Sequence, residues 1–302
     1  MNMTKSSAVQ TIPIDETDIP AGRALRMDFA RFWSTEQGEP RDVYDRFISA
    51  TPAAAAVDVQ RGDSGIWVRP DGASSENALL FVHGGGYGLG RPAAYVGLVS
   101  HLAAHAGVPA FVLDYPLAPE AKLPEALNVA VDTLEQLCDE HRAVVVAGDS
   151  AGGGLALAAI TQGCRQGLDV AAAAVFSPWT DLSLSGPSVR ENAIGDPLLD
   201  PAYLRASAES YLGSADPEDP RASPLHDVSG ELPPLLIQVG SDEILLDDSR
   251  RYAAAVSEAD GTVRLEIWQG MHHVFQLNIE QLASARRALK GAGEFLAAHL
   301  AV

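Results

Sequence analysis

The stretch Gly148-Asp149-Ser150-Ala151-Gly152 decides how this 302-residue chain is read. Ahead of it, the β-branched segment Ala143–Ala147 predicts a buried strand, and behind it Gly153–Ile160 predicts a helix. A G-x-S-x-G pentapeptide at a strand-to-helix turn forces its serine into a strained backbone conformation and exposes the hydroxyl above the sheet. The pattern therefore predicts that Ser150 is a nucleophile.

A second glycine-rich stretch lies upstream. The segment Ala78–Val82 predicts another buried strand, and it ends in His83-Gly84-Gly85-Gly86. Glycines at a strand end can present backbone N–H groups to an oxyanion that develops during acyl transfer. A plain glycine-rich turn is the alternative, and the serine turn downstream disfavours it.

Six segments together resemble the bacterial hormone-sensitive lipase family of α/β-hydrolases, over roughly residues 40–300. They are His83–Gly86, Asp114–Glu120, Gly148–Gly153, Ser177–Leu182, Gly240–Asp242 and Gly270–Phe275. One position departs from the family pattern D-Y-R-L-A-P-E, because Pro116 replaces the arginine. The departure concerns how that loop is anchored, and we expect no effect on the chemistry.

The resemblance implies an α/β-hydrolase fold, and the strand pattern agrees with it. Predicted strands alternate with helical segments at Ile66–Val68, Leu79–Val82, Ala110–Leu113, Val144–Ala147, Ala172–Phe176, Leu235–Val239 and Val263–Trp268. Such alternation favours a mostly parallel central sheet flanked by helices on both faces. We expect a catalytic domain over residues 51–302.

Two regions fall outside this alternation. Residues 21–50 carry aromatic and aliphatic side chains at helical spacing, and residues 1–20 are expected to be poorly ordered. A segment over about 183–226, rich in Pro, Ser, Gly and Asp, has a helical core at Pro201–Leu212. The resemblance implies that residues 1–50 and this insertion form a helical cap over the active site.

The resemblance also assigns the partners of the serine, in the chain order Ser, acid, His. The family pattern places the acid at Asp242, directly after a predicted strand, and makes Asp247 a structural aspartate. The family segment G-M-x-H before an aromatic residue puts the base at His273. His272 then falls at the variable position, where we expect a partly exposed residue at the mouth of the site.

The resemblance implies that Gly85, Gly86 and Ala151 donate backbone N–H groups to the oxyanion. His83 and Asp149 are expected to support their loops. No cofactor and no metal are expected, because adjacent histidines without a third ligand are weak evidence for a metal site. The glycine-rich runs match neither G-x-G-x-x-G nor the P-loop pattern, so a nucleotide role lacks support.

Composition limits the partners. The chain has 21 basic and 40 acidic residues, a net charge of −19, which argues against nucleic acid and anionic membranes. Two cysteines, an N-terminus unlike a signal peptide and no membrane-length apolar run make a cytoplasmic location the expectation. We expect a small-molecule ester as partner, and a homodimer that pairs through the last predicted strand, Val263–Trp268.

The sequence thus predicts a serine carboxylic-ester hydrolase that acts on short-chain or compact esters through an acyl-enzyme. A lactone hydrolase, or an N-acetyl or O-acetyl deacetylase with the same triad, stays open because the cap shapes the pocket. A non-catalytic protein that binds a small ligand is disfavoured, since such proteins typically lose the serine or the histidine.

Overall fold

One nine-stranded sheet organises the chain in the computed structural model, which describes residues 8–62, 64–193 and 195–300. Its order is β1-β9-β8-β7-β6-β4-β5-β3-β2, and β3 alone runs opposite to the direction of the other eight strands. The strands are β1 (Ala8–Ile12), β2 (Val57–Arg61), β3 (Gly65–Pro70), β4 (Asn77–Val82), β5 (Ala110–Leu113), β6 (Ala143–Asp149), β7 (Val170–Phe176), β8 (Leu235–Gly240) and β9 (Val263–Trp268). The predicted α/β-hydrolase architecture is confirmed, and each of the seven predicted strands lies within one observed strand.

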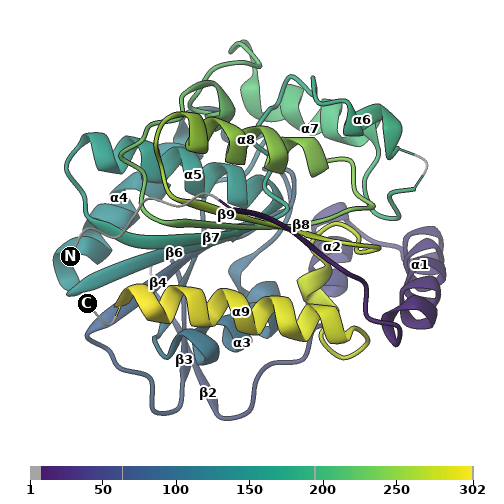
Figure 1. The fold of residues 1–302 in the computed structure, drawn as a ribbon, viewed down its shortest axis with the longest axis horizontal. Coiled ribbons are helices and arrows are strands. Elements are labelled where there is room, and N and C mark those ends of the chain that lie inside the picture. The colour runs from purple at the N-terminus through teal and green to yellow at the C-terminus, as the bar shows by residue number, and fades with distance from the viewer. Residues whose placement is uncertain (1–7, 63, 194, 301–302) are drawn as a thin grey trace.

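Helices cover both faces of the sheet (Figure 1). They are α1 (Asp18–Thr35), α2 (Pro40–Ile48), α3 (Val96–Ala106), α4 (Glu125–Glu140), α5 (Ser150–Arg165), α6 (Ser188–Glu191), α7 (Pro201–Leu212), α8 (Leu246–Glu258) and α9 (Ala283–Leu300), with short 3₁₀ turns η1 (Pro92–Tyr95), η2 (Pro224–His226) and η3 (Phe275–Leu277). Helices α4, α5 and α8 pack on one face, and α3 and α9 pack on the other.

The central strands carry apolar side chains on both faces because helices cover both faces of the sheet. In β6, Val144 and Val146 belong to the core beneath α4 and α5, whereas Val145 and Ala147 belong to the core beneath α3 and α9. Successive side chains of a strand point to opposite faces, so a strand covered twice needs a continuous apolar run. The Val-rich run before Ser150 meets that requirement.

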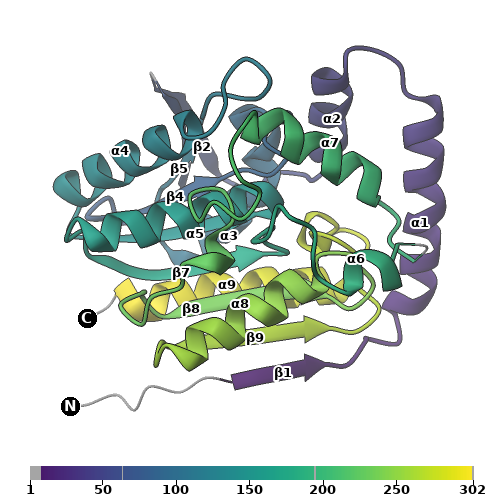
Figure 2. The same cartoon turned by 90° about the horizontal axis from the view of Figure 1, so that it is seen from above.

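Strand β1 corrects two expectations (Figure 2). It pairs in parallel with β9, from Ala8 opposite Arg264 to Ile12 opposite Trp268. The expected poor order is therefore wrong for residues 8–20, and residues 1–7 lie outside the described part of the chain. The expectation that β9 offers an unpaired edge is also wrong, because β1 occupies that edge.

Helix α1 is fastened to the body of the protein at its first residue. The Asp18 carboxylate, 1% exposed, accepts hydrogen bonds from the backbone N–H groups of Ala283 (2.7 Å) and Ser284 (2.8 Å). These two groups open helix α9, where an N–H has no partner within the helix. From this anchor α1 extends to the end of the sheet where α2, α6 and α7 also gather (Figure 2).

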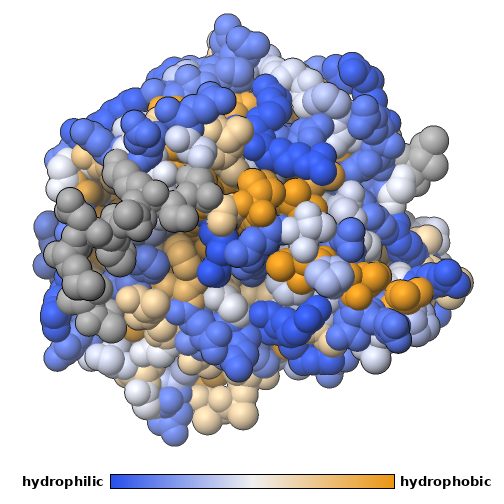
Figure 3. Space-filling view, viewed as in Figure 1, coloured by the Kyte–Doolittle hydropathy of each residue, from blue (hydrophilic) through white to orange (hydrophobic). Residues whose placement is uncertain are grey.

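The surface of the molecule is mainly hydrophilic on the face shown in Figure 3. Among the described residues, the large hydrophobic side chains that stand exposed are Val9, Ile19, Met27, Trp33 and Val59. Within that same part of the chain, no helix has both the length and the apolar character needed to cross a membrane.

Candidate active site

Ser150 lies at the turn from β6 to α5 with a positive φ of 52°. The turn is possible because Gly148 and Gly152, two positions before and after the serine, lack side chains. A Cβ at Gly148 would lie 2.7 Å from the Gly152 carbonyl oxygen, and one at Gly152 would lie 2.2 Å from the His83 carbonyl oxygen. The glycines of the pentapeptide thus permit the close approach that holds the serine hydroxyl above the sheet.

His273 lies in the loop after β9 and contacts the serine directly. Its Nε2 is 2.9 Å from the Ser150 Oγ, and both residues are buried. The next residue, Val274, has a φ of 47°, which is strained for a β-branched side chain. Its N–H donates to the Ser177 Oγ at 3.1 Å, and this bond holds the loop in place.

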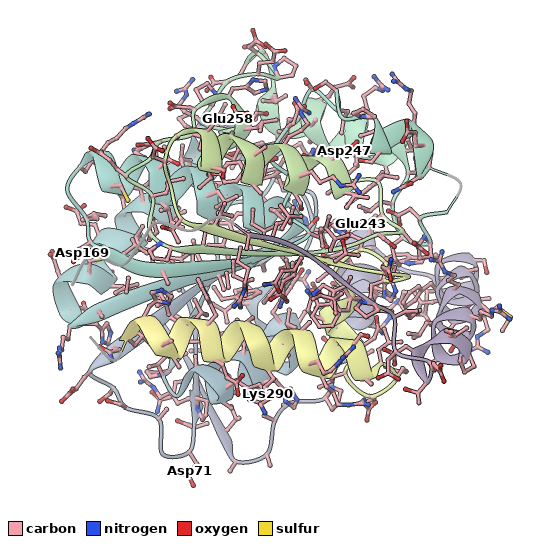
Figure 4. The ribbon with its side chains drawn as sticks, viewed as in Figure 1. Asp71, Asp169, Glu243, Asp247, Glu258 and Lys290 are labelled. Atoms are coloured by element: carbon pink, nitrogen blue, oxygen red, sulfur yellow. The ribbon has the colours of Figure 1, made fainter. Side chains whose placement is uncertain are left out.

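The carboxylate on the other side of the imidazole belongs to Glu243. Its Oε2 is 2.7 Å from the His273 Nδ1, and the side chain is fully buried. Its Oε1 accepts hydrogen bonds from the Ser177 hydroxyl and from the Gly240 N–H, both at 2.7 Å. Figure 4 places Glu243 inside the molecule, near the end of β8, while acids such as Asp71 and Asp169 lie at the periphery.

The prediction that Asp242 orients the imidazole is wrong in this structure. The Asp242 carboxylate is 40% exposed and lies 2.8 Å from the Arg26 Nη2, and it accepts from the Ser241 hydroxyl at 2.7 Å. The segment after β8 continues alongside the loop that follows β9, since the Asp242 N–H donates to the Met271 carbonyl at 3.0 Å. In the turn that follows β8, Glu243 points inward to His273 and Ser177, whereas Asp242 points outward to Arg26.

The pKa values of the two adjacent histidines shift in opposite directions. Burial alone would lower the pKa of His273, but the charge and hydrogen bond of Glu243, with smaller contributions from Asp196 and Asp149, raise it above its ordinary value. For His272, burial lowers the pKa to about 4. Its Nε2 lies 2.8 Å from the Asn278 Oδ1. The expectation that His272 is partly exposed is wrong, because its exposed fraction is 3%.

The glycines after β4 also adopt backbone that other residues avoid. Gly85 has a φ of 119° and Gly86 a φ of 60°, and a Cβ at Gly85 would lie 2.2 Å from the Leu89 carbonyl oxygen. Both glycines line the same cavity as Ser150. Ala151 follows Ser150 in the first turn of α5, where a backbone N–H has no partner within the helix.

Asp149 ties this glycine loop to the serine turn. Its Oδ1 accepts from the Gly84 N–H at 2.9 Å, and its Oδ2 accepts from the Tyr95 hydroxyl at 3.3 Å. The Tyr95 hydroxyl is 2.9 Å from that of Tyr44 in α2, so the chain of contacts reaches the N-terminal helices. Burial raises the pKa of Asp149 to about 7.

His83 supports the same loop from the other side. Its Nδ1 is 2.8 Å from the Gly84 carbonyl oxygen, and its ring stacks on Tyr115 at a centroid distance of 4.4 Å. Burial lowers the pKa of His83 to about 4, so the ring is neutral near pH 7. A neutral, enclosed ring of this kind suits a supporting role.

A cavity of about 480 Å³ opens over Ser150 and His273. Besides the glycine loop and the serine turn, its lining includes residues of the loop after β9 (His273, Val274, Leu277), the helices α1 and α2 (Trp33, Tyr44, Phe47, Ile48), the segment before α7 (Ala193, Asp196, Pro197, Leu198, Leu199, Asp200) and α7 itself (Tyr203, Leu204). The N-terminal helices and the insertion thus both contribute walls to the space in front of the serine.

Asp196 and Arg26 hold the cavity walls to the segment after β8. No sequence pattern identifies either residue. The Asp196 carboxylate accepts from the backbone N–H groups of Leu198 (2.9 Å), Leu199 (3.0 Å) and, from beside Glu243, Ile244 (3.0 Å). Arg26 of α1 donates to the Gly195 carbonyl and to Asp242. Both roles depend on contacts between segments far apart in the chain.

No group of three or more His, Cys, Asp or Glu side chains is placed to hold a metal ion within the described ranges. Asp247 binds the insertion to α8, since its Oδ2 accepts from the Ser188 N–H at 2.8 Å.

Comparison with known proteins identifies the fold and the family of the chain. A family model described as alpha/beta hydrolase fold matches residues 79–277. An acetyl-hydrolase of Streptomyces hygroscopicus is 42% identical over 280 residues, which span 87% of this chain and 92% of that protein. An esterase of Acinetobacter venetianus is 36% identical over 228 residues, 74% of this chain and 75% of that protein.

Solved structures of similar proteins have the same fold. An esterase from the bacterial hormone-sensitive lipase family superposes with a TM-score of 0.88 at 32% identity, over 93% of this chain and 98% of that one. A hormone-sensitive lipase from a metagenome library superposes with a TM-score of 0.84 over 95% and 99%. The chain is an α/β-hydrolase. Within that fold it belongs to the bacterial hormone-sensitive lipase family, as the sequence motifs predicted.

Proposed function

We propose that this protein is a serine carboxylic-ester hydrolase whose catalytic triad is Ser150, His273 and Glu243. The observation that carries the proposal is the unbroken buried chain from Ser150 Oγ to His273 Nε2 (2.9 Å) and from His273 Nδ1 to Glu243 Oε2 (2.7 Å). A nucleophile, a base and an orienting acid within hydrogen-bond reach are what acyl transfer requires. Relatives named as esterases and an acetyl-hydrolase support the same class.

In the first half-reaction the Ser150 Oγ attacks the acyl carbon while His273 Nε2 takes its proton. Glu243 stabilises the imidazolium that forms and fixes the tautomer that leaves Nε2 free to accept. The carbonyl oxygen, now negative, receives hydrogen bonds from the N–H groups of Gly85, Gly86 and Ala151. Each such donor lowers the barrier by about 3 kcal/mol.

The first half-reaction ends when the imidazolium of His273 gives its proton to the leaving alkoxide, and the acyl group stays on Ser150. In the second half-reaction water takes the place of the alcohol. The neutral imidazole then takes a proton from water, whose oxygen attacks the acyl carbon, and Ser150 regains its proton as the acid departs. The proposal needs neither a metal nor a cofactor.

The cavity over the serine favours compact substrates. At about 480 Å³, with α1, α2 and α7 as walls, it suits a short acyl or alkyl group better than a long-chain lipid. We therefore propose short-chain esters, with the N-terminal helices and the 183–226 insertion as the cap. Removal of acetyl groups is the second candidate, because one relative is named acetyl-hydrolase. Lactones remain a third.

Replacing the nucleophile tests the proposal. Ser150→Ala should lower kcat for p-nitrophenyl butyrate by about 10⁶-fold, the scale for triad serines. A fluorophosphonate should add its mass to wild type at Ser150 and not to the variant. Ser34→Ala, an exposed serine of α1, is the control and should behave as wild type. Retention of more than a few per cent of turnover by folded Ser150→Ala would refute the assignment.

A substrate panel then separates the candidates. Initial rates should be compared for p-nitrophenyl esters of two to twelve carbons (acyl length), for acetylated sugars and amides, and for lactones. The highest kcat/KM is expected among acetyl to hexanoyl esters. A maximum at a long-chain ester would contradict the compact-substrate proposal, and a maximum for acetamides or lactones would select the corresponding alternative.

Assembly and compartment belong to the proposal as well. Since β9 is covered by β1, a homodimer formed through the sheet would use the outer edge of β1, where Val9 is 69% exposed. Light scattering that gives 31.8 kDa at all micromolar concentrations would exclude it. A cytoplasmic location accords with Cys138 and Cys164, both free thiols, and cell fractionation tests it.

A further inference from the structure

Two side chains separate the cavity over Ser150 from a second cavity. The second one, of about 380 Å³, lies between α1, the end of α2 and residues 277–281. Phe47 of α2 and Leu277 of η3 line both cavities. They therefore form the wall at which the catalytic cavity ends on this side.

Packing holds both members of the wall in place. The half-buried Phe47 ring lies among three rings of α1, with centroid distances of 5.4 Å to Phe29, 5.3 Å to Phe32 and 5.1 Å to Trp33. The backbone of Leu277 is fixed because its carbonyl oxygen accepts from the Thr51 hydroxyl at 2.7 Å. A ring packed on three sides cannot swing aside at little cost, so the wall is a fixed feature.

The second cavity has an apolar side and a polar side. Leu25, Phe29 and Phe32 supply apolar surface, while charged and polar side chains such as Asp28, Arg31 and Glu280 surround them. A chain that entered past the wall could bury its methylenes on the aromatic side and leave its end near water.

We propose that Phe47 and Leu277 set the chain-length limit of the enzyme, and that shortening either one opens a path by which the second cavity takes the outer methylenes of a medium-length substrate. The inference rests on the proposed ester hydrolysis at Ser150. Each methylene transferred from water into apolar surroundings changes affinity by about fourfold. Two or more additional buried methylenes should therefore raise the relative kcat/KM for longer chains by roughly 10-fold or more.

The test compares chain-length profiles of Leu277→Ala and Phe47→Leu with wild type. Two series are measured below their micelle concentrations: p-nitrophenyl esters from acetate to decanoate, which vary the acyl chain, and acetates of linear alcohols, which vary the other arm. One of the two series lengthens the arm of the substrate that points at Phe47 and Leu277. In that series, wild-type kcat/KM should fall between four and eight carbons. In that series both variants should raise the eight-to-four-carbon ratio by about 10-fold or more.

Two further variants check the path itself. Ala50 and Gln281 are exposed and line only the second cavity. Adding Ala50→Phe to Leu277→Ala should fill the opened space and return the ratio to the wild-type value, whereas Gln281→Ala alone should leave the ratio unchanged. An unchanged ratio in both series for folded Leu277→Ala and Phe47→Leu overturns the inference and leaves the proposed function intact. Absence of any ester hydrolysis in folded wild type overturns both.

Discussion

The two sides of the catalytic cavity are built by different means. On the strand side, Ser150, Glu243 and His273 are at most 7% exposed, and hydrogen bonds of 2.7–2.9 Å join them. On the helix side, α1 is attached near the site by the ion pair of Arg26 and Asp242, whose side chains are 33% and 40% exposed. Buried, interlocked groups fix the chemistry, and exposed contacts control access, so substitutions on the two sides should have effects of very different size.

Three strained residues gather around the catalytic groups, although Leu184 in the insertion also has a positive φ of 56°. Ser150, Ser177 and Val274 have φ values of 52°, 48° and 47°, and all three lie on the strand side. Each such conformation costs about 1–3 kcal/mol and persists only where the surroundings hold it. Here the Ser177 hydroxyl does so, because it donates to Glu243 and accepts from the Val274 N–H. No comparable strain lies within α1, all of whose residues the structure describes.

The largest contrast is expected between adjacent histidines. His273→Ala removes the proposed base and should lower kcat by about 10⁶-fold, as for the serine. His272→Ala removes a buried ring that contacts Phe29 and Asn278, and kcat should fall by at most about 10-fold. Steady-state kinetics of both variants, with circular dichroism as a check of folding, decide the matter. Equal losses would mean that His272 also takes part in the chemistry.

Asp149 tests the support beneath the oxyanion donors. Asp149→Ala leaves the buried Gly84 N–H without its acceptor and should lower kcat by about 10- to 100-fold with little change in KM. Asp149→Asn keeps an oxygen at that position and should recover most of the rate. If KM rises in Asp149→Ala while kcat stays constant, the loop governs substrate binding and not the oxyanion.

The pH profile reports chiefly on the interaction between Glu243 and His273, the largest contribution that raises the His273 pKa. Catalysis needs a neutral His273, and its folded pKa is raised above 6.5, so kcat/KM should fall as the pH drops through a midpoint above 6.5. Each further pH unit below the midpoint lowers kcat/KM by about 10-fold. A midpoint below 6 would contradict the interaction of Glu243 with the imidazole. The Arg26→Gln variant should leave the midpoint in place.

The helix side should respond least. Arg26→Gln breaks a half-exposed ion pair of the kind that contributes about 0–1 kcal/mol, so Tm should fall by at most about 2 °C. Butyrate ester hydrolysis should stay within about threefold of wild type. Arg31→Gln, which breaks the more exposed pair with Asp28, is the matched control. A loss above 100-fold in Arg26→Gln would show that α1 helps to position the catalytic groups.

Features that depend on neighbouring residues could be predicted from the sequence, and features that depend on contacts between distant segments could not. The sheet and the serine turn carry local signals: apolar runs for doubly covered strands, and glycines where a Cβ would collide with backbone. The exchange of Asp242 for Glu243 could not be predicted, because both acids follow β8 directly. The inward orientation of Glu243 shows only in its contacts with His273 and Ser177, which lie 30 and 66 positions away in the chain.

The N-terminal strand illustrates the same limit. Ala8–Ile12 is short, its middle residues are exposed, and its sequence has no distinctive pattern. It becomes a strand because β9 offers it an edge in parallel register. The links made by Asp18, Arg26 and Asp196 are likewise contacts between distant segments, and composition or periodicity gives no sign of them.

The most direct test of the central claim compares Glu243→Gln with Asp242→Asn in one assay of kcat/KM for p-nitrophenyl butyrate. In Glu243→Gln the new side chain would present an amide N–H to the His273 Nδ1 and so favour the tautomer whose Nε2 cannot take the serine proton, with an expected loss of about 10⁴-fold. Asp242→Asn should stay within about threefold of wild type, because its carboxylate faces Arg26. The reverse ranking would contradict the account and return the acid of the triad to Asp242.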